Sequence, residues 1–226
     1  MKNFTIFAFT LLVVVSCSSN KHLTADYEKF AQGHSLIAVL PYDIQMTGRK
    51  VVEMEQEDVD ALRRIESKLF QQSLYSEVLK RTGNRKKDIK ISVQDINKTN
   101  RLLKSAGIAM IEIRDHSPKE LGDILGVDAV ISTRLVKEMF LSREESLLMD
   151  VATSTILDKV PVHIGYVNKA KITRSAEVDI YCTIVDAQAE SAIWVYNTEC
   201  DLQWDSDPDD AIERINGRIS KKFPYK

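Results

Sequence analysis

The spacing of apolar residues divides the chain into expected strands and helices. A continuous apolar run at 35–42 is typical of a strand buried on both faces. Apolar residues recur every three or four positions over 54–81, which predicts a long amphipathic helix. We expect further helices at 95–106, 117–125 and 142–157, and from 207 until Phe223. Further strands are expected at 89–93 and 127–136, and a strand or extended connection at 108–114. Residues 43–50 are expected to form a loop, and residues 158–175 irregular chain.

Two alternating segments, 176–185 and 192–204, predict a hairpin that turns near 187–190. Placing the apolar positions of both strands on one face sets Cys200 opposite Val178 and Cys182 opposite Tyr196. In that register the two sulfurs lie four residues apart along the ladder, roughly 13 Å, which is beyond disulfide reach. The alternative is a disulfide between Cys182 and Cys200, which would form if the domain folds in an oxidising compartment. We favour two buried free thiols.

The order of these elements predicts one α/β domain over 35–226, a sandwich with helices packed on a mixed β-sheet. The chain has 226 residues, of which 44% are hydrophobic and 28% charged, and this composition excludes collagen-like and strongly disordered classes. Its formal net charge of −2 gives no reason to expect a nucleic-acid partner.

The N-terminus has the features of a bacterial lipoprotein signal. Lys2 precedes an apolar run that extends from Phe4 to Val15, and residues 14–17 read Val-Val-Ser-Cys. The run is shorter than the roughly 18 residues that a spanning helix needs. Because Val-Val-Ser-Cys resembles a lipobox, we expect residues 1–16 to be a signal peptide and Cys17 to be acylated. The alternative is an ordinary cleaved signal followed by a chance cysteine.

Acylation of Cys17 would hold the protein at a membrane. The resemblance to lipoproteins implies three acyl chains, palmitate among them, and two or more chains anchor stably where one does not. Residues 17–34 are polar, and we expect them to form a lipidated tether. Ser18, rather than Asp, resembles lipoproteins that reach the outer membrane. The near-neutral charge suggests that lipid, not electrostatics, provides the anchor.

No recognised catalytic or metal-binding motif occurs along the chain. The adjacent residues Asp115, His116 and Ser117 contain the residue types of a hydrolase triad, but functional triads come from distant segments. Ser117 is better explained as a helix cap. Residues 205–210 begin like a calcium loop but lack its later Gly and Glu, so acidic helix capping is favoured. We expect no catalytic residue, cofactor, metal or small-molecule substrate, and no enzymatic activity.

Two surface features are candidates for binding. The cluster Arg85, Lys86, Lys87 is more often a solvated turn, although it could form a weak patch for acidic lipid or glycan. Trp194, Tyr196 and Trp204 lie on one strand of the expected hairpin and form mainly a packing stripe. We also consider them as a protein-contact surface near a sheet edge.

Several short motifs resemble those of the CsgG/LpoB/TolB-N-terminal-like group of periplasmic lipoproteins. They are the opening strand that ends in Pro41 and Tyr42, the Leu-Gly-Asp element of 121–131, the late hairpin with Asp186 and Trp194, and the closing segment 222–225. Together they cover residues 36–225. The chain departs from the group at 132–133, where Ser-Thr replaces a Gly, and in a longer connection over 140–175. It lacks a long amphipathic hairpin suited to a CsgG-like pore.

The resemblance implies a TolB N-terminal-like fold and an accessory or assembly role. We therefore expect a lipid-anchored lipoprotein of the cell envelope, facing the periplasm and anchored in the outer membrane. Its domain would bind another envelope protein, as an LpoB-like regulator of cell-wall synthesis or an assembly factor would. The alternative is a lipid-anchored module that binds glycan or peptidoglycan.

Overall fold

The computed structural model describes residues 19–52, 54–83, 85–139, 175–203 and 208–225. Its strands are β1 (Ser19–Leu23), β2 (Leu36–Val39), β3 (Asp43–Thr47), β4 (Ser92–Val93), β5 (Ala129–Met139), β6 (Ser175–Asp186) and β7 (Ser191–Gln203). Its α-helices are α1 (Tyr27–Ala31), α2 (Arg49–Val52), α3 (Gln56–Leu79), α4 (Ile96–Ser105), α5 (Pro118–Leu125) and α7 (Pro208–Lys221), with a 3₁₀ turn at Ile113–Asp115.

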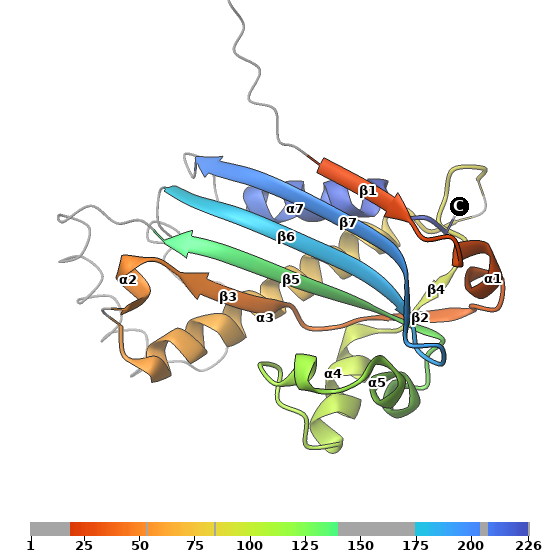
Figure 1. Cartoon of the computed structure of the whole chain (residues 1–226), viewed down its shortest axis with the longest axis horizontal. Coiled ribbons are helices and arrows are strands. Elements are labelled where there is room, and N and C mark those ends of the chain that lie inside the picture. Colours follow the sequence, from red (N-terminus) through yellow and green to blue (C-terminus); the bar gives the residue numbers. More distant parts are fainter. Residues whose placement is uncertain (1–18, 53, 84, 140–174, 204–207, 226) are drawn as a thin grey trace, which may run out of the picture.

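The strands form one mixed sheet in the order β1-β7-β6-β5-β2-β4, and β3 also pairs with β5 (Figure 1). The pairs β1/β7, β6/β7 and β5/β6 are antiparallel, whereas β2 and β3 run parallel to β5. The expected α/β class, with helices packed on a mixed sheet, is confirmed.

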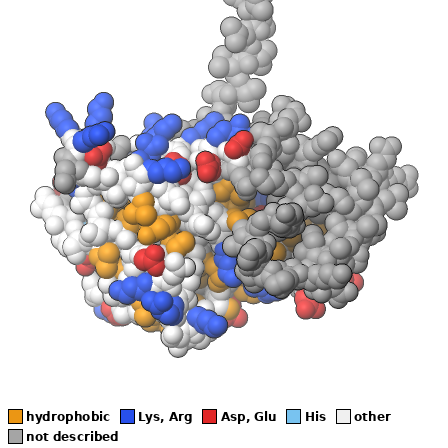
Figure 2. Space-filling view, turned by 180° about the vertical axis from the view of Figure 1, so that it is seen from behind, with side chains coloured by type: hydrophobic (Ala, Val, Ile, Leu, Met, Phe, Trp, Pro, Cys, Tyr) orange, Lys and Arg blue, Asp and Glu red, His pale blue; other side chains and the backbone are white. Residues whose placement is uncertain are grey.

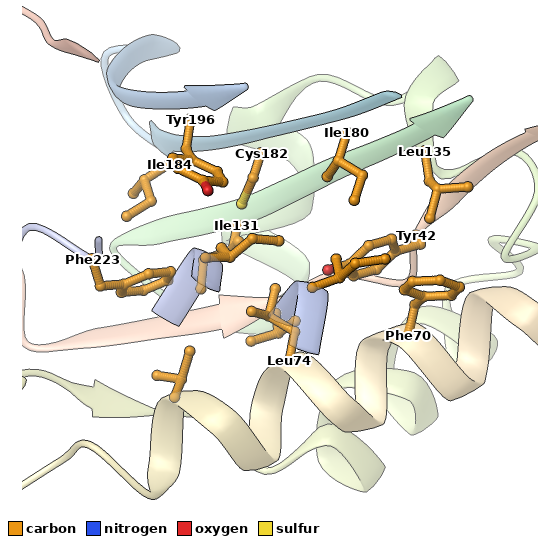
Figure 3. Packing of buried hydrophobic residues seen from close by; sticks show 14 of the residues in the cluster. Tyr42, Phe70, Leu74, Ile131, Leu135, Ile180, Cys182, Ile184, Tyr196 and Phe223 are labelled. Carbon is orange, nitrogen blue, oxygen red and sulfur yellow. The ribbon is translucent and has the colours of Figure 1, made fainter. Parts of the chain in front are cut away.

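The main core lies between the sheet and the two helices behind it, α3 and α7 (Figures 1 and 3). Alternate residues of the central strands, such as Ile131, Ile180 and Ile184, point toward Phe70 and Leu74 of α3 (Figure 3). All five are at most 4% exposed. The apolar side chains that recur every three or four residues in α3 therefore pack against those that alternate along the strands, and together they form one core layer.

A smaller core lies on the opposite face of the sheet. Ala38 and Val130 point away from α3 and pack against Leu103 of α4 and Leu121 of α5. The helices α4 and α5 form this second layer. They cover the β2 end of the sheet and lie below β1, β6 and β7 in Figure 1. Of the described helices, α5 and α1 contact β6 and β7 at one end only, and none covers the front of the rest of β6, β7 and β1.

Helix ends follow the signals in the sequence. The Asp95 carboxylate accepts hydrogen bonds from two backbone amides in the first turn of α4, and the Ser117 hydroxyl accepts one from Glu120 N at 3.1 Å. Gly126 ends α5 with φ of 65°, a left-handed conformation that suits glycine. The expected Ser117 cap of α5 is confirmed.

The expected hairpin is also confirmed. Val178 pairs with Cys200 and Cys182 with Tyr196, and the strands turn over residues 187–190. Cys182 is a buried free thiol, as expected. The side chain of Cys200 lies outside the described residues, and so do the helix expected at 142–157 and the segment 158–174.

Three expectations about local structure are wrong. Residues 43–47 form β3 instead of a loop, because Ile44 and Met46 alternate with polar residues and reach the core. Residues 19–31 form β1 and α1 instead of a tether, since β1 pairs with five residues of β7. Of the strand expected at 89–93, only Ser92 and Val93 form β4, although Ile89 and Ile91 are buried.

Candidate functional site

The aromatic residues expected to form a contact surface lie in the core. Trp194 is 0% and Tyr196 1% exposed, and their rings stack with centroids 6.0 Å apart. Trp194 also packs against Phe223, which follows α7. The surface expectation is therefore wrong for these two residues: β1 pairs with the free edge of β7, and α7 covers the face on which both rings lie. Trp204 lies outside the described residues.

The other expected site residue, Cys17, also lies outside the described residues. The described residues begin at Ser19, the first residue of β1, which pairs with Thr198. The register continues to Leu23, opposite Trp194. Thr24 extends this contact, because its amide nitrogen donates to Ile193 O at 3.2 Å. The strand that follows the lipobox-like segment is thus an integral part of the sheet.

The open face of the sheet beside β1 contains a shallow hollow of about 160 Å³. It lies over β6, β7 and the first residues of β1. Polar side chains dominate its lining, and Tyr181 at its rim is 43% exposed. Asn197 Oδ1 is buried there without a hydrogen-bond partner among the described residues. A buried carbonyl oxygen without a donor is costly, so this oxygen is ready to accept a hydrogen bond from a bound molecule.

The charge in the hollow is negative, because Asp179 and Glu199 are the ionisable carboxylates in its lining. Asn20 of β1 and Asn197 of β7, which pair in the register, add amide groups that both donate and accept. The hollow is therefore suited to polar ligands, and it favours hydrogen-bond donors over anions.

A second polar cluster lies at the end of the sheet where β2 begins. His34 Nδ1 lies 2.7 Å from the Tyr225 hydroxyl, and its Nε2 lies 2.8 Å from Asp186 Oδ2. The other oxygen of Asp186 accepts a hydrogen bond from Ala189 N in the β6–β7 turn, at 2.6 Å. The His34 side chain is only 3% exposed. This clasp of His34, Asp186 and Tyr225 joins the N-terminal segment, the hairpin turn and the C-terminus.

Electrostatics explain how the clasp is held. Burial raises the pKa of Tyr225 well above its usual value, and Tyr27 and nearby carboxylates raise it further. Tyr225 therefore keeps its proton, and its hydroxyl can donate a hydrogen bond to His34 Nδ1 while Nε2–H donates one to the Asp186 carboxylate. Burial alone would raise the pKa of the neighbouring Asp128, but hydrogen bonds from the Ser35 and Leu36 backbone and the Ser35 hydroxyl outweigh it and lower that pKa.

An aspartate, a histidine and a protonated hydroxyl in sequence have the form of a proton relay. The hollow on the open face, however, is lined by none of the clasp residues, and the imidazole of His34 is closed off from solvent. A relay needs access to a reacting group. The geometry of the clasp therefore fits a structural role, in which three segments far apart in the chain are tied together.

Sequence reasoning missed His34, because residues 18–34 are polar and were assigned to a tether. A signal was present in Tyr27 and Phe30, which are three positions apart and pack against the main core from α1. That spacing indicates a short helix with one buried face, and hence an ordered chain up to His34.

The remaining sequence candidates occupy separate places. His116 Nδ1 lies 3.0 Å from Glu120 Oε1 in α5, and Ser117 caps that helix, so Asp115, His116 and Ser117 do not form a triad. Residues 205–207 lie outside the described residues. The side chains of Arg85, Lys86 and Lys87 are exposed in a turn that follows α3.

The described residues contain neither a membrane-spanning helix nor a cluster of metal-ligating side chains. Within the described ranges, no helix has both the length and the apolar character needed to cross a membrane. Nor does this part of the chain bring three or more His, Cys, Asp or Glu side chains together in a group that could hold a metal ion.

Comparisons with known proteins complete the description of the site. No family model matches the chain, and no curated protein matches it. Solved structures that are similar include lipoprotein GNA1162 from Neisseria meningitidis, at 10% identity over 82% of this chain and 93% of that one, with a TM-score of 0.44. A PelC dodecamer from Paraburkholderia phytofirmans has 7% identity over 92% and 96%, with a TM-score of 0.40. The LpoB C-terminal domain from Salmonella enterica has 10% identity over 78% and 92%, with a TM-score of 0.36.

Proposed function

We propose that this protein is an exported lipoprotein, acylated at Cys17, whose α/β domain binds another protein of the cell envelope without catalysing a reaction. The observation that carries the proposal is the lipobox-like sequence Val14 to Cys17, which ends a short apolar leader and lies one residue before β1. An acyl anchor at that position leaves the domain outside the bilayer and close to its surface.

The open face of the sheet supports a binding role. The exposed ring of Tyr181 and the unpartnered Asn197 Oδ1 lie on this face, next to the hollow. Tyrosine is enriched in protein interfaces because its rigid ring offers a large contact area together with a polar group. Because the main core fills the opposite face of the same strands, a partner would contact these strands on the face that no described helix covers.

The finer parts of the proposal rest on sequence. Ser18 after the acylated cysteine favours an outer-membrane anchor, with the domain in the periplasm. Palmitate is then one of the acyl groups on Cys17. The role that we propose is that of an accessory subunit, either a regulator of cell-wall synthesis that resembles LpoB or an assembly factor.

The anchor is tested by replacing Cys17 with alanine in the full chain. We expect Cys17→Ala to abolish the lipid mass on the N-terminal peptide and to move the protein from the membrane fraction to the soluble fraction. The matched control Ser18→Ala leaves the cysteine in place and should keep both properties. Equal membrane association of the Cys17→Ala variant would contradict the anchor.

Partner binding is tested by crosslinking in intact cells. A photo-crosslinking amino acid replaces Tyr181 on the open face or, as the control, Lys104, an exposed residue of α4. We expect a discrete protein adduct from position 181 and none from position 104. Equal patterns from both positions would contradict binding through the open face.

A second candidate function, glycan or peptidoglycan binding, is favoured by the amide and carboxylate lining of the hollow. Amides and carboxylates are suited to hydrogen bonds with sugar hydroxyls. Purified cell-wall sacculi distinguish the two functions. Retention of the purified protein on sacculi without any other protein, and its loss in Asn197→Ala, would favour glycan binding over a protein partner.

A further inference from the structure

The distance between the proposed anchor and the folded domain is short. Only Ser18 separates Cys17 from Ser19, the first residue of β1, and two peptide units span at most about 7 Å. An acyl chain on Cys17 therefore enters the bilayer close to the beginning of β1. A long flexible linker would let the domain take any orientation, but this spacing does not.

The strand that receives the anchor is held firmly at one edge of the sheet. β1 pairs with β7 from Ser19 opposite Thr198 to Leu23 opposite Trp194. The rest of β7 continues into the sheet through β6, so that β1 cannot swing out without breaking this ladder. The edge formed by β1 is therefore the part of the domain nearest to the membrane.

Positive charge gathers along the same side of the molecule. β1 and α7 both lie along the upper edge in Figure 1, and Figure 2, turned about the vertical axis, shows Lys and Arg side chains along that upper edge. The helix α7 and the residue after it carry three acidic residues in the first two turns, Asp209, Asp210 and Glu213, and four basic residues toward the C-terminal end, which are Arg214, Arg218, Lys221 and Lys222.

The turn after α3 adds to this charge. Residues 85–90 contain four basic residues and one acidic residue, although the whole chain has a formal net charge of −2. The turn is joined to the C-terminal segment by a hydrogen bond from Lys90 N to Tyr225 O, at 2.8 Å. The Tyr225 ring in turn lies 6.2 Å from that of Tyr27 in α1, the helix that follows β1. Turn, C-terminus and β1 edge thus form one side of the domain.

From these observations we infer that the edge formed by β1, α7 and the turn at 85–90, called the basic edge, faces an anionic membrane surface. The inference rests on the proposed acylation of Cys17. Anionic lipid headgroups attract clustered Lys and Arg within a Debye length of the surface.

The consequence for the proposed function is geometric. The acyl chains hold the protein, and the basic edge selects its orientation. With the basic edge toward the lipid, α4 and α5 lie at the end of the domain away from the bilayer, and the open face stands beside the membrane, where an envelope protein can bind it. Lipid and charge thus have separate tasks.

The orientation is tested with native lysines as reporters. The full chain, purified from membranes and reconstituted into vesicles of phosphatidylglycerol and phosphatidylethanolamine, is acetylated with a water-soluble reagent and analysed by peptide mass spectrometry. We expect Lys86, Lys87 and Lys222 to react several-fold more slowly than in phosphatidylcholine vesicles. Lys98 and Lys104 of α4, exposed on the opposite side, should react at equal rates in both.

Charge reversal provides the matched pair of variants. Lys86→Glu with Lys87→Glu should abolish the protection of Lys222, whereas Lys98→Glu with Lys104→Glu should preserve it. High salt should remove the protection but leave the protein on the vesicles. Uniform reaction of all lysines, or protection on α4, would overturn the inference. Protection of the basic edge only in the presence of another protein would overturn it as well.

The two proposals fail separately. The mass of the N-terminal peptide reports acylation by itself, so an unmodified Cys17 would refute the anchor without deciding the orientation. In that case the Cys200→Ser form of the chain, coupled through Cys17 to a maleimide lipid in the same vesicles, gives the same lysine readout. An unprotected basic edge on the acylated protein would refute the orientation alone.

Discussion

The two faces of β6 and β7 are built from alternate residues of the same strands, yet they differ in almost every property. Ile180, Cys182 and Trp194 face α3 and α7 and are 0% exposed. Tyr181, which lies between Ile180 and Cys182, and Asn197, which follows the buried Tyr196, lie on the face that no described helix covers, and they border the hollow. Successive residues of a strand point to opposite faces of the sheet, so one side chain lies in the core and the next lies at the surface.

The comparison teaches where stability and binding are located. The covered face excludes water from large apolar side chains, which is the main source of folding free energy. The open face retains features that cost stability, such as a buried carbonyl oxygen of Asn197 without a donor. Groups of this kind are tolerated where a bound molecule can satisfy them.

The largest effect is expected from the covered face. Trp194→Ala should lower the free energy of unfolding by about 3–5 kcal/mol, because it removes a buried indole that packs on Tyr196 and Phe223. Urea denaturation measures this change. Tyr181→Ala, the control on the open face, should cost less than about 1 kcal/mol. Similar losses for the two variants would contradict the difference between the faces.

The clasp at the end of the sheet should give the next largest effect. His34→Ala leaves the Tyr225 hydroxyl and the Asp186 carboxylate without their partner, which should cost about 1–3 kcal/mol. Its matched control is His22→Ala, an exposed histidine of β1, with a change within about 0.5 kcal/mol. If denaturation midpoints of the two variants coincide, the clasp does not stabilise the fold.

A smaller effect depends on pH. Burial raises the pKa of the Cys182 thiol to about 12, whereas an unfolded thiol ionises near 8.5. The unfolded chain therefore loses this proton first as pH rises, and the stability contributed by the group declines between the two values. Between pH 9 and 10 this group alone should lower the free energy of unfolding by about 1.2 kcal/mol, and buried tyrosines such as Tyr225, whose pKa is also raised, add to the decline as the pH approaches 10.

Replacing the thiol tests this origin. Cys182→Val should flatten the decline in stability between pH 9 and 10, measured by urea denaturation at each pH. Thr183→Val, the next residue on the open face, should retain it. An unchanged slope in Cys182→Val would show that another group controls the alkaline response.

The smallest effect is expected from the hollow. Asn197→Val removes the unpartnered oxygen and places a β-branched residue in a strand, so stability should rise by about 0.5–1 kcal/mol. The same change should reduce crosslinking of a partner from position 181. A loss of stability would show that Asn197 Oδ1 already accepts a hydrogen bond and is not available to a bound partner.

Much of the fold could be predicted from the sequence, wherever the pattern was long and locally consistent. The 24 residues of α3 and the register of the β6–β7 hairpin were both predicted, because helix and strand periods differ and extend over many positions. The short elements β1, β3 and α1 were missed. Each has only five residues, too few for a period to emerge from polar surroundings.

The site was harder to predict than the fold. Trp194 and Tyr196 were correctly placed on one face of a strand, but which face becomes covered depends on where α7 packs. His34 lies 152 residues before Asp186 in the chain and 191 residues before Tyr225. No local pattern indicates contacts over such distances.

The sequence by itself determined the signal-like leader with Cys17, the α/β class, the helix caps and the alternation of the hairpin, because each depends on neighbouring residues. Only the tertiary structure decided that β1 directly follows the proposed anchor as part of the sheet, that the aromatic stripe is core, and that the basic residues of α7 and the turn at 85–90 share one edge. Those results come from packing between distant segments, which selects one arrangement among the many that the local patterns allow.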